Sequence, residues 1–104
     1  MKRVLVCEII YQTTGERWGI FPRDIGEFQA RLVSDERIIN NSNTNTIIKR
    51  SANFEIISTS FTPDEKNKRH RKALEDLVQE LQQAGWKQQP EQGTEWYNLT
   101  FRKK

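Results

Sequence analysis

The last third of the chain constrains the fold most, because it predicts one long helix followed directly by a β-hairpin. Thr62-Pro63-Asp64-Glu65 is typical of a helix start, with a threonine cap, a proline at the first helical position and a glutamate that completes a capping box. Residues of one helix face then recur at spacings of four, three, four and three: His70, Leu74, Leu77, Leu81 and Ala84. Gly85 is a natural left-handed stop. We therefore expect a helix over about 63–84.

The residues after this helix predict the hairpin. Segments 86–89 and 95–102 flank Pro90-Glu91-Gln92-Gly93, which is typical of a turn. Alternation along the second segment directs one set of side chains to the core: Tyr97, Leu99 and Phe101. The opposite set, which faces solvent or a partner, is Trp96, Asn98 and Thr100. These three residues are a candidate protein interface.

The first part of the chain predicts further strands. Residues 3–12 form a strand that is apolar on both faces, and Thr13-Thr14-Gly15-Glu16 predicts a turn into a second strand over 17–21. Another strand is expected over 27–34, and one or two short strands between 46 and 60. The fold class is therefore α+β: an antiparallel sheet of about five strands, with the helix packed on one face.

At 104 residues the chain is predicted to be a single α+β domain, 1–104, with an exposed Asn-rich loop at about 40–46. One helix can cover only one face of the sheet, whereas the first strand is apolar on both. We expect a second copy of the chain, as a two-fold dimer, or another protein partner to cover the other face.

No pattern in the chain points to catalysis, to a metal or to a cofactor. The one histidine, His70, lies at the edge of the helix stripe and is expected to be partly exposed and structural. The one cysteine, Cys7, lies in an apolar strand and is expected to be buried and unreactive. A lone cysteine and the lack of a long apolar run predict a cytoplasmic protein with no membrane partner. We do not expect an enzyme.

A basic cluster at the helix start is the densest charge feature. It consists of Lys66, Lys68, Arg69, Arg71 and Lys72. These side chains could contact the phosphates of a nucleic acid, and the alternative is a solvated helix start that nearby carboxylates partly neutralise. The net charge of +3 is too small to decide between them. Trp18 and Trp86 are expected to complete the core, so Trp96 is the tryptophan more suited to a partner.

With these residues assembled, the chain resembles a group of small, uncharacterised bacterial α+β domains. The resemblance rests on Cys7-Glu8-Ile9 in the first strand, Trp18 in the second, Gly85-Trp86 after the helix, and Trp96-Tyr97 through Phe101-Arg102 at the end. It implies strands, one helix and a final hairpin, and no activity. The sequence thus favours a non-catalytic binding or assembly module that acts through protein contacts. A nucleic-acid-binding accessory protein that uses the basic helix start is the alternative.

Overall fold

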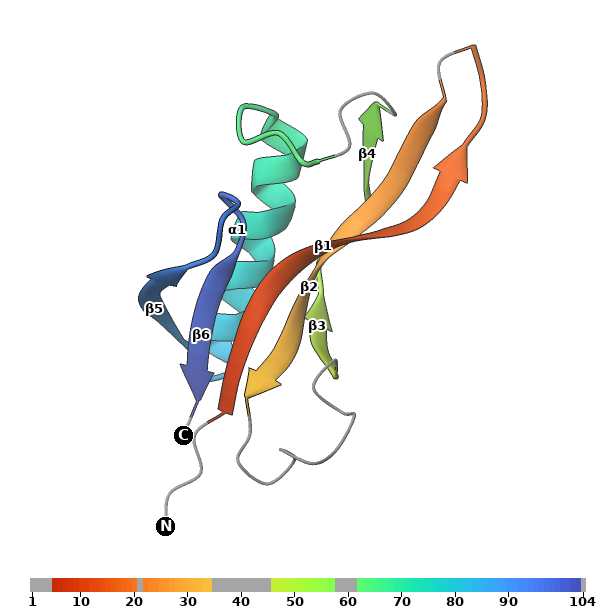
Figure 1. Cartoon of the computed structure of the whole chain (residues 1–104). Helices are drawn as coiled ribbons and strands as arrows, with labels where there is room; N and C mark the ends of the chain where they lie inside the picture. The colour runs from red at the N-terminus through yellow and green to blue at the C-terminus, as the bar shows by residue number, and fades with distance from the viewer. Residues whose placement is uncertain (1–4, 21, 35–45, 58–61, 104) are drawn as a thin grey trace.

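A computed structural model describes residues 5–20, 22–34, 46–57 and 62–103. The elements in chain order are β1 (Leu5–Arg17), β2 (Arg23–Ser34), β3 (Ile47–Arg50), β4 (Phe54–Ile57), α1 (Lys68–Gln83), β5 (Lys87–Gln92) and β6 (Leu99–Lys103). The described strands form one antiparallel sheet in the order β3-β2-β1-β6-β5, and β4 pairs with β2 further along. The α+β prediction, with one helix and a C-terminal hairpin, is confirmed (Figure 1). Residues 40–45 of the Asn-rich stretch lie outside the described residues.

The β1–β2 hairpin is longer than the sequence predicted, and its turn lies elsewhere. β1 continues through the expected turn to Arg17, and the chain reverses between Arg17 and Arg23. The pairing shifts between Thr13 and Gly15, so the extra residue Thr14 forms an irregularity in the strand. A glycine beside such an irregularity gives the same local signal as a turn. The predicted second strand over 17–21 is therefore wrong.

This hairpin forms an arm that projects beyond β3, β5 and β6, and β4 pairs with its β2 strand from Gly26 to Arg23 (Figure 1). β1 pairs with β6 only from Leu5 to Glu8, and the outer half of β1 continues with β2. Gly26 lies where the Tyr11 ring crosses the arm, and a Cβ there would overlap the ring atoms. The ring thus packs directly on the glycine backbone, as aromatic side chains do when they cover a glycine in a sheet.

The core lies between α1 and one face of the sheet. The fully buried side chains with the largest volumes are Phe28, Phe101, Ile9, Leu77, Leu81 and Cys7. Phe28 is at the centre of an aromatic cluster, because its ring centroid lies 4.9 Å from that of Phe54, 5.2 Å from that of Tyr97 and 5.9 Å from that of Trp96. Trp86 is buried, as the sequence predicted.

The helix begins later than predicted and ends close to where it was expected. Asn67, not Thr62, caps α1, and its Oδ1 accepts hydrogen bonds from the backbone N–H groups of Arg69 and His70. Gly85 has a φ of 97°, the left-handed conformation that suits glycine at a helix end. The first turn of α1 contains no acidic residue. α1 is not long and apolar enough to cross a membrane, and no other helix lies in the described ranges.

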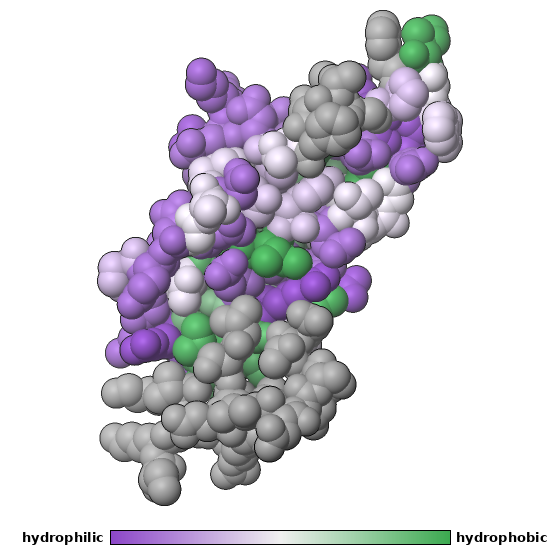
Figure 2. Space-filling model, in the orientation of Figure 1, coloured by the Kyte–Doolittle hydropathy of each residue, from purple (hydrophilic) through white to green (hydrophobic). Residues whose placement is uncertain are grey.

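The sheet face opposite α1 is not a continuous apolar surface. Val6 and Ile10 are half-buried there, but a polar network lies beside them. The Gln29 amide donates to Glu27 at 2.9 Å, and the Arg31 guanidinium donates to Gln29 at 2.8 and 3.0 Å. In Figure 2 hydrophobic patches on this side of the molecule are separated by hydrophilic ones. The predicted two-fold dimer therefore loses part of its physical basis, and it stays a prediction.

Candidate functional site

The outer end of the arm carries two large apolar side chains in contact with solvent. Trp18 is 78% exposed and Ile20 is 92% exposed, and they are the exposed large hydrophobic residues of the described chain. Figure 2 shows hydrophobic surface at this end of the molecule. The expectation that Trp18 completes the core is wrong, because β1 extends to Arg17 and carries Trp18 beyond the reach of α1. The apolar segment Trp18-Gly19-Ile20-Phe21-Pro22, which lies between Arg17 and Arg23, was the signal in the sequence.

Two ion pairs fix the base of this tip to β4. Arg17 Nη1 lies 2.9 Å from one carboxylate oxygen of Glu55, and Arg23 Nη1 lies 3.0 Å from the other. The hydrogen bonds from Arg17 and then Arg23 lower the pKa of Glu55, so this carboxylate stays ionised at neutral pH. The last residue of β1, the first residue of β2 and the middle of β4 are thereby held together.

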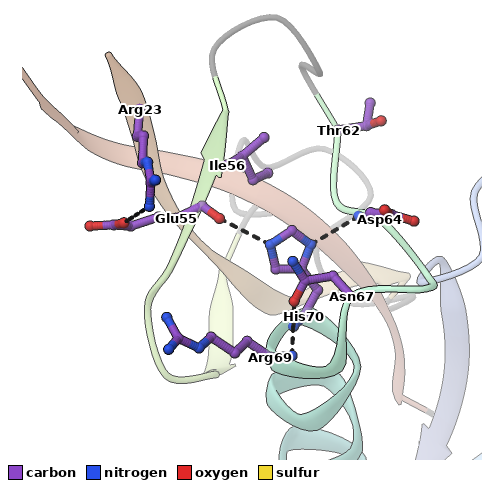
Figure 3. Close-up of a pocket in the computed structure, with 8 residues that line it drawn as sticks. All are labelled: Arg23, Glu55, Ile56, Thr62, Asp64, Asn67, Arg69 and His70. Carbon is purple, nitrogen blue, oxygen red and sulfur yellow. Dashed lines mark hydrogen bonds and ion pairs between the residues drawn. The ribbon is translucent and has the colours of Figure 1, made fainter. Parts of the chain in front are cut away.

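We call these paired side chains the Arg17–Glu55–Arg23 brace. A hollow of about 230 Å³ lies beside this brace, between β4 and the start of α1 (Figure 3). β2 and β4 supply Arg23 and Glu55 to its lining, and the pre-helical segment and α1 supply Asp64, Arg69 and His70. Its charged lining is thus mixed. A second hollow of about 350 Å³ lies at the tip itself, and it shares Arg23 and Glu55 with the first.

His70 joins β4 to the segment that precedes the helix. It is 4% exposed, and its Nδ1 accepts a hydrogen bond of 2.9 Å from the backbone N–H of Asp64. Its Nε2 therefore carries the proton and donates to the carbonyl oxygen of Glu55 at 3.0 Å (Figure 3). The prediction of a partly exposed histidine is wrong, although the predicted structural role agrees with this geometry. Both ring nitrogens are occupied, so neither is free to act as a base or as a metal ligand in this arrangement.

The five basic residues at the helix start are all exposed, but they differ in their partners. Arg71 lies 3.8 Å from Glu75, and Lys72 lies 3.4 Å from Asp76, one helical turn away in each case. Lys66, Lys68 and Arg69 form no ion pair with another described residue. The cluster therefore keeps part of its positive charge.

The residues of the predicted protein interface make contacts within the fold. Trp96 is half-buried, and its indole Nε1–H donates to the carbonyl oxygen of Pro63 at 3.1 Å. The Asn98 amide donates to the carbonyl oxygen of Ile9 at 2.9 Å, and Thr100 is half-buried on β6. β6 begins only at Leu99, so residues 96–98 lie before the strand and do not follow its alternation. Trp96 thus packs against the core, contrary to the orientation that alternation predicted.

The remaining candidate for chemistry, Cys7, is fully buried. Burial raises the pKa of its thiol to about 12, so the thiol stays protonated at neutral pH. Within residues 5–20, 22–34, 46–57 and 62–103, no three side chains of histidine, cysteine, aspartate or glutamate lie close enough together to hold a metal ion.

No protein-family model, curated protein or solved structure matches the chain. What is shown of the resemblance noted above is the small α+β architecture, with its antiparallel sheet and one helix.

Proposed function

We propose that this protein is a non-catalytic binding module whose main contact with another protein is the tip of the β1–β2 arm. The observation that carries the proposal is the exposure of Trp18 and Ile20, at 78% and 92%. Membership of the group of small bacterial domains is part of the same proposal, and it adds no activity.

The surroundings of the tip support this proposal. Large apolar side chains in water contribute nothing to folding, whereas tryptophan and arginine are the residues that dominate the binding energy of protein interfaces. Trp18 lies beside Arg17, and Arg23 lines the same hollow. The ion pairs with Glu55 restrain the tip before a partner arrives, which lowers the entropic cost of binding.

Site-specific photo-crosslinking in the source organism tests the proposal. With a benzophenone amino acid in place of Ile20, we expect a discrete covalent adduct with one protein, which mass spectrometry identifies. With the two proteins purified, Trp18→Ser is expected to weaken binding by at least about tenfold, as for an interface hot spot.

The matched control is the exposed helix residue Gln82, which lies at the far end of α1. The crosslinker at this position should give no adduct, and Gln82→Ser should leave the affinity unchanged. Equal adducts from positions 20 and 82, or no adduct from position 20, would count against the tip as the contact surface.

Nucleic-acid binding through the basic helix start is the second candidate. It is supported by Lys66, Lys68 and Arg69, which form no ion pair within the described part of the chain. They lie around the positive end of the helix dipole, where acidic residues would be more stabilising, and the first turn contains none. A sequence that departs from this stability rule without an evident compensation fits a functional surface.

Titration with labelled single- and double-stranded oligonucleotides at about 50 and 200 mM salt tests this candidate. If phosphates are contacted, affinity should fall steeply with salt, and replacement of all five basic helix residues by glutamine should abolish binding. The exchange Lys87→Gln on β5 alters one exposed charge away from the cluster and is the control. The absence of binding at either salt concentration would reject the candidate.

A further inference from the structure

The arm tip and the basic helix start belong to one hollowed surface. Arg23 and Glu55 line both the hollow at the tip and the hollow of Figure 3. Glu55 and Arg69 in turn line a third hollow of about 410 Å³, which reaches Lys72 on α1. A partner that lies along these hollows would contact the apolar tip and the helix cations together.

Ion pairs neutralise some of the charges along this surface and leave others without a partner among the described residues. Glu55 is shared by two guanidinium groups, which leaves one positive charge in excess at the brace. Arg69 lines two of the hollows and has no ion pair with any other residue in the described ranges. A partner with carboxylates opposite these cations is therefore complementary in charge.

We infer that this surface binds an acidic segment of a protein that also carries an apolar side chain, with the apolar group against Trp18 and Ile20 and the carboxylates toward Arg69. This inference rests on the proposed function and gives its partner a chemical class.

The acidic residues on the same surface distinguish such a segment from a nucleic acid. Glu55, Asp64 and Asp76 lie among the cations that line the hollows. A phosphate backbone has a negative charge at every nucleotide and would meet these carboxylates, whereas a protein can place its charges only where cations lie. Trp18 is also the one aromatic ring of the described chain that is largely exposed, so successive bases would find a single stacking platform.

Binding of defined peptides tests the inference. The probe is a fluorescein-labelled peptide that repeats Glu-Glu-Leu, and its two controls repeat Gln-Gln-Leu and Glu-Glu-Ser. We expect each control to bind at least about tenfold more weakly than the probe, because each lacks one of the two contacts. On binding, the solvent-exposed fluorescence of Trp18 should become protected from acrylamide, and Trp18→Phe removes this signal while it keeps an apolar ring.

Two variants of the protein separate the contacts. Arg69→Gln should weaken the binding of the acidic probe and reduce the salt dependence of that binding, while the weak binding of the Gln-Gln-Leu peptide stays unchanged. Gln82→Ser should change neither the affinity for the acidic probe nor the affinity for the Gln-Gln-Leu peptide. Equal binding of the neutral and acidic peptides, the absence of binding by the probe, or its displacement by an oligothymidylate of equal charge would each overturn the inference. If the crosslinked adduct at position 20 nevertheless forms, the proposed function stands and only the acidic partner is rejected.

Discussion

Replacement of Phe28 by alanine is expected to lower the free energy of unfolding by about 3–5 kcal/mol, the usual loss when a buried phenylalanine is truncated. Phe28 is fully buried in the middle of β2, and its ring contacts aromatic side chains from three other parts of the chain: Tyr11 of β1, Phe54 of β4, and Trp96 and Tyr97 before β6. The substitution would thus remove the ring contacts that Phe28 makes with β1, with β4 and with the segment before β6. The free energy of unfolding of a domain is about 5–15 kcal/mol in total, so this loss is a large share of it.

Urea denaturation, followed by far-UV circular dichroism, measures this effect. Phe28→Leu keeps most of the volume and should lose less than the alanine variant, so it remains measurable if the alanine variant does not fold. Ile20→Ala removes apolar atoms from a side chain that is 92% exposed, and it should change the stability by less than about 0.5 kcal/mol. A loss for Phe28→Ala no larger than that for Ile20→Ala would contradict the packing described here.

The second large effect is expected for His70→Leu, at about 2 kcal/mol. Leucine fills much of the space of the imidazole, but it can neither accept from the Asp64 N–H nor donate to the Glu55 carbonyl oxygen. Both backbone groups then lose their partner at the edge of the core. Because Trp96 donates to Pro63, next to Asp64, the environment of this indole should change as well.

Equilibrium urea unfolding and the tryptophan fluorescence spectrum report the two consequences of His70→Leu. Arg69→Leu is the matched control, since it introduces the same side chain at the neighbouring, exposed position of α1. It should leave both the stability and the Trp96 emission near their original values. If His70→Leu proves as stable as the unaltered protein, the two hydrogen bonds of the ring do not hold the pre-helical segment.

Local signals in the sequence predicted the elements that depend on nearest neighbours. The stripe that includes Leu74, Leu77 and Leu81 identified the buried face of α1, and Gly85 marked its end. The helix start was misplaced because Thr62 and Asn67 are both good caps. Tertiary contacts decide between them: His70 and Trp96 bind the backbone at Asp64 and Pro63 and hold that segment outside the helix.

The errors about the site arose from register, which local patterns do not determine. Gly15 fits a turn as well as a strand irregularity, and this choice decides whether Trp18 lies over the core or at the end of an arm. Trp96 was misread for the same reason, because the start of β6 sets which residues alternate. The Arg17–Glu55–Arg23 brace joins residues far apart in the sequence, and no spacing along the chain announces it.

The pairing of β1 with β6 also decides when the core can close as the chain is synthesised. Cys7 lies opposite Phe101, so the strand made first is completed by the strand made last among the described elements. Until Phe101 has been translated, residues 5–8 of β1 lack their partner on one edge and the core lacks a fully buried phenylalanine. The core therefore closes only after the β5–β6 hairpin has been made, and this non-local pairing is expected to be the slow step of folding.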